Sequence, residues 1–586
     1  MTTTDLIPMR AVYADNIGTV EKIHFEFEGR ALTALVGDSI AAALISYGIV
    51  SLRETQAGTA RGIFCGMGIC QDCLVEIDGN TNQRACMVQA KQGMRISRQR
   101  FPGAPNQERT DNREDCSGAI EAETPDIVVI GGGVGGMSAA CMAAETGLDV
   151  ILLDERARPG GQFSKQPTPT HADSSMARND NQIRLGQKLM ERMTRAGINV
   201  ISNAQVWAGF PERDILTLVD GRTRLFRPQR LIIATGAYER ALPIEGWTLP
   251  GVITTGAAQS LLRTYHVIAG KRIFVAGNGP FNIQVALELA RAGATIVGIA
   301  ESASRPGIRS IKALFDMYRG ARNLLFDGIQ YISQLKNNNI PMFYNYSLSS
   351  IKKMENGLEA TISLPSSSKI SARKEISIEA DIVCMGYGFL PSNVLLRNLG
   401  CEHHYDTFHR QLIVDRSENF ETTNSGIYAV GDCAGLGGAY AACDEGTIAG
   451  LHAATSLGRK ANDKHLAEIS RSRLELNRHR RFQSGLWRLY SAQLPKTVEA
   501  KPETHICRCE LVTMEQICDV IESGCNSISE IKQQTRAGMG RCQGRYCASL
   551  LVEILTSGSS DPIDEENFFA PRVPISPIRI GDITRF

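Results

Sequence analysis

Eight of the sixteen cysteines stand in two groups of four, one near each end of this 586-residue chain. Thiolates are ligands for iron and zinc, and grouped cysteines hold metal more often than they form disulfides where thiols stay reduced. Each group has enough thiolates to complete a metal centre from protein ligands alone. The predicted metal ligands are Cys65, Cys70, Cys73 and Cys86 in the first group and Cys507, Cys509, Cys542 and Cys547 in the second.

The spacing of the first group favours a cluster of two irons. Cys65-x4-Cys70-x2-Cys73 begins like the run of plant-type ferredoxins, and Cys86 follows after twelve residues. Three thiolates on a tight loop and a fourth from a neighbouring strand can hold two irons tetrahedrally. The closing gap is shorter than in plant ferredoxins and resembles that of the small ferredoxin-like domains attached to multi-subunit dehydrogenases. A zinc site is the alternative, although zinc fingers favour two separated cysteine pairs.

The second group has a different pattern, Cys-x-Cys followed after 32 residues by Cys-x4-Cys. The segments "ICRCE" (506–510) and "KQQTRAGMGRCQGRYC" (532–547) resemble the bacterioferritin-associated-ferredoxin-like (BFD-like) domain. That resemblance implies a 2Fe-2S cluster in a small helical domain, with all four cysteines as ligands. Positive charge nearby either tunes such a cluster or forms a solvated face, and it comes from Arg536, Arg541 and Arg545.

A glycine-rich turn in the middle of the chain predicts a dinucleotide site. Gly131-x-Gly133-x-x-Gly136 directly follows the apolar segment "DIVVI" and opens a predicted helix. The glycines permit a tight turn, close approach of a pyrophosphate and close helix–strand packing. Glu155 lies 24 residues after Gly131, at the end of the next predicted strand. A carboxylate there can accept hydrogen bonds from ribose hydroxyls.

Three further motifs resemble those of the two-dinucleotide-domain flavoproteins, the family of the glutathione and thioredoxin reductases. They are Gly160-Gly161-Gln162, "LIIATG" ending at Thr235 and Gly236, and "SGIYAVGDCAG" with Gly431 and Asp432. The resemblance implies FAD in the first nucleotide-binding domain, held by these motifs, with Asp432 on its ribityl and phosphate side. The Cys-x-x-Cys pair of disulfide-reducing members does not occur between Gly131 and Asp432, so disulfide chemistry is not expected.

A second glycine motif, Gly277-x-Gly279-x-x-Asn282, suggests another nucleotide site. Asparagine replaces the third glycine, which puts a side chain where helix and strand should touch. Glu301 follows Gly277 by 24 residues, the same interval as in the first motif. NAD(P) or another nucleotide is therefore one expectation for this site, and a fold retained only for packing is the other.

The elements around these motifs predict an α/β protein with two Rossmann-like dinucleotide-binding domains of the pyridine-nucleotide-disulfide-reductase type. The strand–helix–strand design repeats at 126–155 and 272–301, as in doubly wound sheets. The expected units are an N-terminal β-grasp ferredoxin domain of α+β type (1–103), a linker (104–123), an FAD-binding domain in two parts (124–245 and 376–460), a second nucleotide-binding domain (246–375), a helical connector (461–502), the BFD-like domain (503–558) and an extended tail (559–586).

The composition is that of an ordinary globular protein, with 43% hydrophobic and 21% charged residues. A net charge of +1 gives no reason to expect a nucleic-acid partner. The sequence has neither a signal peptide nor an apolar run long enough for a transmembrane segment, so we expect a cytoplasmic protein that meets the inner face of a membrane only through a partner. In the basic helix expected near 471–490, Leu474, Trp487 and Leu489 are expected to pack inward.

Over nearly its whole length the chain resembles the electron-transfer subunits of heteromeric amino-acid dehydrogenases, among them the opine oxidases, hydrogen cyanide synthase and sarcosine oxidase. The segment 236–262, "GAYERALPIEGWTLPGVITTGAAQSLL", carries much of this likeness. The resemblance implies a partner FAD subunit of the D-amino-acid-oxidase/glycine-oxidase type that oxidises a C–N bond of an opine, amino acid or related secondary amine. No catalytic residue is then expected here, only FAD with a 2Fe-2S cluster on either side, passing electrons to an acceptor.

Three alternatives remain open at this point. A self-contained NAD(P)H-dependent flavin and iron–sulfur reductase would use both nucleotide domains. A hydrogen cyanide synthase subunit would serve a partner that acts on glycine. An iron-responsive module docking on a storage protein would leave the flavin unit without a role.

Overall fold

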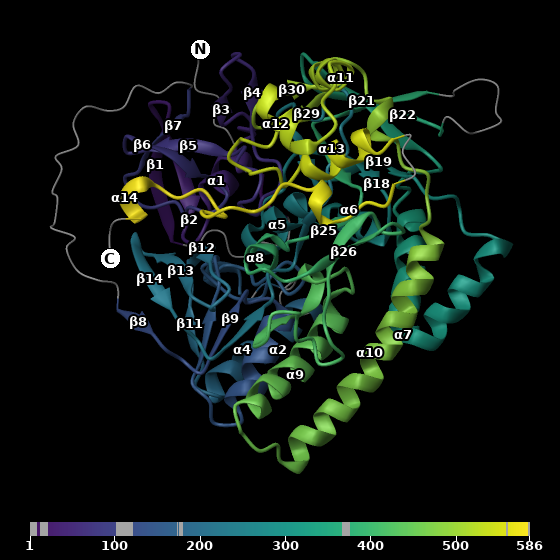
Figure 1. Ribbon diagram of the computed structural model, residues 1–586. Helices are drawn as coiled ribbons and strands as arrows, with labels where there is room; N and C mark the ends of the chain where they lie inside the picture. The colour runs from purple at the N-terminus through teal and green to yellow at the C-terminus, as the bar shows by residue number, and fades with distance from the viewer. Residues whose placement is uncertain are drawn as a thin grey trace.

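Figure 1 shows the computed structural model, in which the N-terminal domain (purple) and the C-terminal domain (yellow) lie together at the top of the view, above the first nucleotide-binding unit (blue). The structure describes residues 9–11, 21–100, 121–172, 174, 178, 180–365, 375–557 and 561–583. Residues 104–120 of the predicted linker, with Cys116, lie outside this range.

The N-terminal domain is a five-stranded sheet with one helix against it. The strand order is β2-β1-β7-β5-β6, and β1 and β7 pair in parallel at its centre. Alternation along β1 buries Phe25 and Phe27, and Ser39 caps the buried helix through its side chain. These elements are β1 (Lys22–Phe27), β2 (Arg30–Leu35), α1 (Ile40–Ser46), β5 (Leu74–Ile77), β6 (Asn80–Arg84) and β7 (Arg95–Arg98).

The first nucleotide-binding unit is a parallel sheet whose two central strands are buried along their whole length. Such uniform burial is expected where helices cover both faces of a sheet. The strand order is β11-β10-β9-β15-β28. The strands are β9 (Ile127–Ile130), β10 (Val150–Leu153), β11 (Asn199–Ile201), β15 (Arg230–Ile233) and β28 (Ile427–Ala429), and the helices are α2 (Val134–Ala144), α4 (Asn181–Arg195) and α9 (Ala439–Ser456).

The second unit repeats the design with the order β17-β24-β18-β19-β20, again parallel. The repeat confirms the predicted fold class of two Rossmann-like units. Its strands are β17 (Val252–Thr254), β18 (Arg272–Gly277), β19 (Thr295–Glu301), β20 (Met342–Tyr344) and β24 (Ile382–Gly386), with helices α5 (Thr255–Tyr265) and α6 (Pro280–Arg291).

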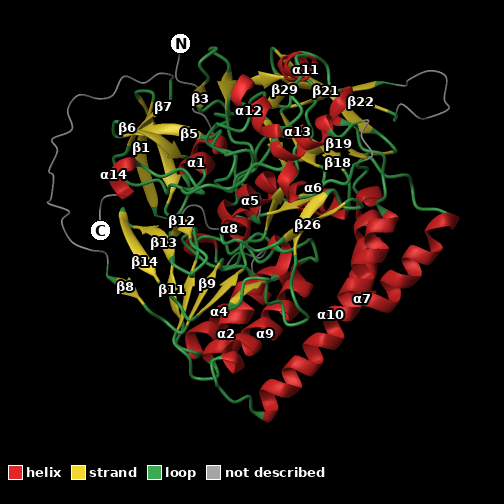
Figure 2. Cartoon of the chain, in the orientation of Figure 1, coloured by secondary structure: helices red, strands yellow, loops and turns green. Residues whose placement is uncertain are grey.

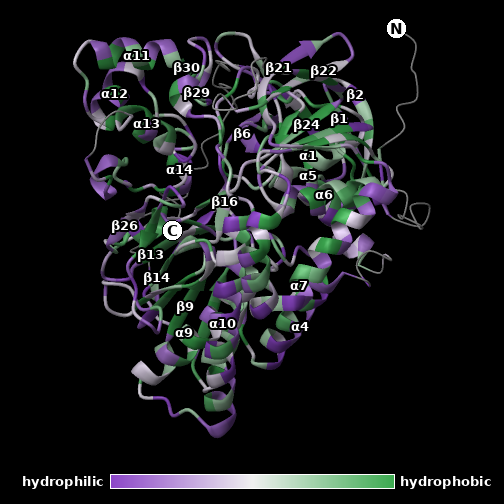
Figure 3. Cartoon of the chain, turned by 90° about the vertical axis from the view of Figure 1, so that its right-hand side faces the viewer, coloured by the Kyte–Doolittle hydropathy of each residue, from purple (hydrophilic) through white to green (hydrophobic). Residues whose placement is uncertain are grey.

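Two long helices, α7 (Ile311–Asn337) and α10 (Asp463–Leu489), pack against each other at one side of the molecule (Figure 2). Along both of them hydrophilic and hydrophobic stretches alternate (Figure 3). Leu474 of α10 is 54% exposed, so the expectation that it packs inward was wrong. It lies two residues from the buried Ser472 and Leu476, about 200° around the helix. None of the helices in the described ranges is both long and apolar enough to cross a membrane.

The C-terminal domain is small and mostly helical, as predicted. It comprises β29 (His505–Cys507), β30 (Val512–Thr513), α11 (Met514–Glu522), α12 (Ile528–Thr535) and α13 (Ala548–Leu555). The tail after it runs back across the first nucleotide unit to α14 (Ile580–Ile583). Its backbone is held on the way by Gln543, Arg545, Trp207, Gln205 and Thr223.

Candidate functional site

The turn between β9 and α2 forms one end of a deep cavity. Gly131 and Gly133 line this cavity, and Gly136 lies behind them in the first turn of α2. A Cβ atom on Gly136 would stand 1.9 Å from the carbonyl oxygen of Gly131, so only glycine lets the helix start so close to the turn. A Cβ on Gly161 would stand 2.8 Å from the Cα of Gly133, so the two glycine loops touch. This backbone cradle has the shape that a pyrophosphate needs.

Asp154, which the sequence patterns did not single out, ties this cradle together. Its side chain accepts hydrogen bonds from the backbone N–H groups of Gly132, at 2.6 Å, and Arg156, at 2.7 Å. Burial raises the pKa of Asp154 to about 6, against the effect of these two hydrogen bonds. A carboxylate directly before the predicted ribose acid was the available signal.

Glu155 lines the cavity at the place expected for a ribose-binding acid. Its Oε1 also accepts a 2.7 Å hydrogen bond from the guanidinium of Arg84, in the N-terminal domain. Arg84 in turn donates to the carbonyl oxygen of Gly68, in the loop between Cys65 and Cys70. The first cysteine loop is therefore connected to the edge of the nucleotide site through a single arginine.

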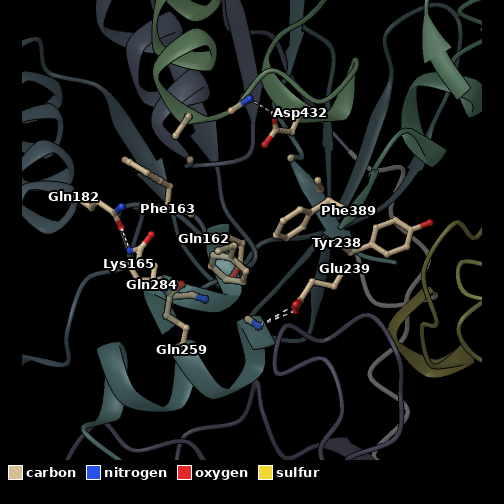
Figure 4. Close-up of a pocket in the computed structure, with 18 of the residues that line it drawn as sticks. Gln162, Phe163, Lys165, Gln182, Tyr238, Glu239, Gln259, Gln284, Phe389 and Asp432 are labelled. Atoms are coloured by element: carbon tan, nitrogen blue, oxygen red, sulfur yellow. Dashed lines mark hydrogen bonds between the residues drawn. The ribbon is translucent and has the colours of Figure 1, made fainter. Parts of the chain in front are cut away.

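The other end of the cavity is formed by Thr235, Gly236, Gly431 and Asp432. Figure 4 shows Asp432 at the edge of this pocket, with Gln162 and Phe163 from the second glycine loop also facing it. Asp432 Oδ1 accepts hydrogen bonds from the backbone N–H groups of Gly437 and Gly438, and burial raises its pKa. The structure thus brings the three predicted FAD motifs to one cavity, from segments far apart in the chain.

Two buried ionisable side chains in the cavity wall were also missed. Lys165 lies three residues after Gln162 and bonds to the hydroxyl of Ser260, and burial lowers its pKa well below the usual value. Glu239 accepts two hydrogen bonds from the backbone N–H of Gly256 near the start of α5 (Figure 4). Burial raises the pKa of Glu239 to about 7.

The cavity measures about 1550 Å³ and continues from the first nucleotide unit into the second. Pro280, Phe281, Glu301 and Arg305 line the second part. The volume exceeds the 300–1,000 Å³ range usual for a single small-molecule site, so there is room for more than one ligand.

The strand register changes the interpretation of Glu301. In the second unit Gly277 lies opposite Glu301, whereas in the first unit Ile130 lies opposite Leu153, which places Gly131 beside Asp154. Glu301 accepts hydrogen bonds from the N–H groups of Gly279 and Ala303, as Asp154 does from its own loop. Glu301 is therefore the counterpart of Asp154 rather than of Glu155, despite the equal 24-residue intervals.

Asn282 does not hold the second turn apart. Its side-chain amide donates to the carbonyl oxygen of Gly386 at 2.8 Å, and its Oδ1 accepts from the hydroxyl of Thr255 at 2.9 Å. The side chain is buried and connects α6 to β24 and α5. The binding roles predicted for Gly277, Gly279, Asn282 and Glu301 stay predictions.

The four N-terminal cysteines come together as two pairs. The side chain of Cys65 contacts that of Cys70, and Cys73 contacts Cys86. All four are buried, and the N–H groups of Met67 and Cys70 point at the sulfur of Cys65, at 3.5 and 3.4 Å. A cluster of two irons needs one thiolate pair on each iron, so this donor set fits a 2Fe-2S cluster.

The C-terminal cysteines form two pairs as well. Cys507 contacts Cys547, and Cys509 contacts Cys542. Each pair thus joins the Cys-x-Cys segment to the later Cys-x4-Cys segment. In the part of the chain that the structure describes, no three His, Cys, Asp or Glu side chains gather around a single metal position. The cysteines that the sequence grouped are therefore brought together in pairs, and their role as iron ligands remains our assignment.

The two cysteine sets lie against each other, whereas the sequence patterns had led us to expect them on either side of the flavin. Arg508, between Cys507 and Cys509, donates a 2.8 Å hydrogen bond to Asp72, between Cys70 and Cys73. The Arg508 guanidinium also lies 3.8 Å over the ring of Phe64, and both partners of the ion pair are buried. Although burial acts to raise it, Arg508 and Arg53 lower the pKa of Asp72. Both sets consequently lie on the same side of the flavin cavity.

Comparison with protein families agrees with this arrangement. Residues 125–458 match pyridine nucleotide-disulphide oxidoreductases, residues 20–100 match a 2Fe-2S iron-sulfur cluster binding domain, and residues 505–557 match a BFD-like [2Fe-2S] binding domain. The predicted cofactors, FAD and two 2Fe-2S clusters, are thereby confirmed.

The chain is also similar to components of several oxidases. It is 29% identical to an opine oxidase subunit of Agrobacterium tumefaciens over 78% of this chain and 91% of that protein. It is 30% identical to hydrogen cyanide synthase subunit HcnB of Pseudomonas aeruginosa over 77% and 96% of the two chains. L-proline dehydrogenase from P. horikoshii shares the fold, with a TM-score of 0.70 and 19% identity over 98% of this chain and 99% of that one. With its family match extending over more than half of its length, the chain belongs to the pyridine nucleotide-disulphide oxidoreductases, as a flavo-iron–sulfur oxidoreductase.

Proposed function

We propose that this protein is the electron-transfer subunit of a heteromeric amine dehydrogenase or oxidase. A partner FAD subunit of the D-amino-acid-oxidase or glycine-oxidase type would oxidise a C–N bond of an opine, an amino acid or a related secondary amine. The observation that carries the proposal is the direct contact of two buried cysteine sets with each other and with the flavin cavity. FAD would exchange electrons in pairs or singly, and each 2Fe-2S cluster one at a time.

The chain's own residues serve binding and insulation in this scheme. The glycine loops and Asp432 would hold FAD, and the eight cysteines would hold iron. Phe64, Trp247 and Tyr546 exclude water between the cysteine sets, since each is at most 2% exposed. No residue of this chain is assigned to act on the amine, which is consistent with a substrate site on the partner.

The relatives support the subunit role and the substrate class. The opine oxidase relative, hydrogen cyanide synthase subunit HcnB and the alpha chain of sarcosine oxidase are each named as one component of an oxidase or synthase. A hydrogen cyanide synthase subunit serving a glycine-oxidising partner is a second candidate, because HcnB is as similar to this chain as the opine oxidase relative is. A cytoplasmic location is part of the same proposal.

A self-contained NAD(P)H reductase is less well supported by the second nucleotide unit. Both oxygens of Glu301 accept hydrogen bonds from backbone N–H groups, so this carboxylate is already occupied within its own loop. We expect NADH and NADPH not to bleach the flavin of the isolated chain within a turnover time. Rapid bleaching, followed by stopped-flow absorbance, would favour the reductase.

The central test is a single cysteine substitution in the copurified complex. Cys542→Ser should remove one cluster and slow electron delivery to an external acceptor at least tenfold, while substrate still reduces the partner's flavin. Cys518→Ser is the matched control, because Cys518 lies in the same domain, on α11, outside the proposed ligand set. Iron and sulfide content, flavin absorbance and turnover are measured for both. Unchanged turnover in Cys542→Ser would refute the electron-transfer role of this cluster.

A further inference from the structure

Tyr546 occupies the position where the two cysteine sets and the flavin cavity meet. It directly precedes Cys547 in the C-terminal domain, yet its ring contacts residues of the other two parts of the molecule. The ring centroid lies 5.7 Å from that of Phe64, the neighbour of Cys65, and 5.7 Å from that of Tyr238, which lines the flavin cavity. Both contacts are edge-to-face, so Tyr546 fills the space between the three sites.

The hydroxyl of Tyr546 is buried and has no hydrogen-bond partner among the residues that the structure describes. A buried hydroxyl without a partner costs about 1–3 kcal/mol, which is why such groups in native proteins usually face a ligand, water or ion. The neighbouring Tyr238 differs in this respect, because its hydroxyl donates to the carbonyl oxygen of Arg545 at 3.0 Å.

The surroundings of the Tyr546 hydroxyl point to the first cysteine pair. Burial raises the pKa of this hydroxyl well above its usual value, and negative charge on Cys65 and on Cys70 raises it further. Cys65 and Cys70 lie in one hydrophobic cluster with Tyr546, Cys542 and Cys547. The only polar ligand that the proposed cofactors would bring to this apolar site is cluster or thiolate sulfur.

We propose that the Tyr546 hydroxyl donates a hydrogen bond to the sulfur shell of the N-terminal 2Fe-2S cluster, on its Cys65–Cys70 side. Tyr546 is then a positioning residue that the C-terminal domain supplies to the other domain's cluster. The inference rests on the proposed cysteine ligation. Since a reduced cluster carries one more negative charge than the oxidised cluster, a hydrogen bond to its sulfur favours reduction and raises its reduction potential.

The test compares Tyr546→Phe with Tyr238→Phe in the full-length, anaerobically purified chain. Both substitutions delete one buried hydroxyl from the same aromatic group, but only Tyr546 is proposed to face a cluster. Redox titrations followed by EPR give the midpoint potential of each reduced cluster, with the two signals assigned from Cys86→Ser and Cys542→Ser. We expect Tyr546→Phe to lower the reduction equilibrium of the N-terminal cluster about tenfold, about 59 mV for one electron, and Tyr238→Phe to leave it unchanged.

The opposite results are equally clear. An unchanged N-terminal midpoint in Tyr546→Phe, a shift confined to the C-terminal cluster, or an equal shift in Tyr238→Phe would overturn the proposal. Unaltered protein grown with ring-deuterated tyrosine gives a reading that needs no substitution: deuterium coupling should appear on the N-terminal EPR signal, and its absence would also overturn the proposal. Loss of both EPR signals and of iron from the wild-type chain would instead refute the cysteine ligation itself.

Discussion

The two nucleotide-binding units have the same strand–helix–strand design but differ where a ligand would meet the turn. In the first unit the third glycine of the motif leaves room for the helix, and Glu155 lines the cavity beside a separate loop-anchoring acid, Asp154. In the second unit Asn282 fills the glycine position with a buried, hydrogen-bonded side chain. Glu301 serves as the loop anchor, and the residue after it is Ser302.

The difference comes from one irregularity in the second sheet. The pairing of β18 with β19 shifts register between Ile273 and Phe274, where β19 passes from Ile296 to Gly298. The extra residue keeps the sequence interval at 24 while moving the aligned acid by one position. Equal spacing of motifs therefore does not ensure equal geometry, and the first unit alone retains a carboxylate beyond the anchor.

The largest expected effect comes from filling the third glycine position. In Gly136→Ala the added methyl would meet the backbone oxygen of Gly131 at 1.9 Å, and backbone cannot rotate away. We expect FAD affinity to fall at least about 100-fold, at the upper end of the usual cost of overpacking. Flavin absorbance per chain and titration of the apoprotein with FAD measure it.

The matched control lies in the second unit. Asn282→Ala removes hydrogen bonds to Gly386 and Thr255 there and should lower the thermal midpoint while FAD affinity stays within about twofold. Equal FAD loss in both variants would show that the units do not differ as described.

An intermediate effect should appear in the pH dependence of stability. The folded-state pKa values of Asp154 and Glu301 are raised, to about 6 and about 7, from 3.8 and 4.5. The folded state therefore holds an extra proton in each window, and stability falls as pH rises through it, from about 4 to 6 for Asp154 and from about 4.5 to 7 for Glu301. Each group accounts for at most about 3 kcal/mol.

Asp154→Asn and Glu301→Gln separate these two contributions. Each substitution should abolish its own part of the decline, measured as the thermal midpoint relative to wild type across pH 4 to 8 at saturating FAD, these conditions spanning about one unit beyond both pKa values. Parallel pH curves for wild type and variants would mean that these carboxylates are not forced to ionise in a buried site.

The smallest effect is expected for the ribose position itself. Glu155 pairs with Arg84 in a partly exposed ion pair, worth about 0–1 kcal/mol. Glu155→Gln should therefore lower FAD affinity less than about tenfold, with a weaker salt dependence than wild type, and Ser302→Ala should leave it unchanged. A larger loss in Ser302→Ala, seen by FAD titration at low and high salt, would reverse our assignment of the two units.

Much of the site could be predicted because its signals are local. The spacing of Cys65, Cys70 and Cys73 within one loop and of the glycines in each turn follows from chain geometry alone. The anchor roles of Asp154 and Glu301 could not be predicted, because they depend on strand register and on a single bulge. The position of Leu474 depended on helix phase against a neighbour that the sequence pattern did not identify.

The amino-acid sequence by itself determined the cofactor classes, since each needs particular residue types at short, fixed separations. Only the tertiary structure decided how the cofactor sites stand to one another. Arg508 and Asp72 are 436 residues apart in the chain, and their contact arises because a buried charge must find a partner wherever the packed domains offer one. Side-chain pairing across such distances leaves no periodic mark in the sequence, so the shared position of both cysteine sets beside the flavin cavity emerged only from the folded chain.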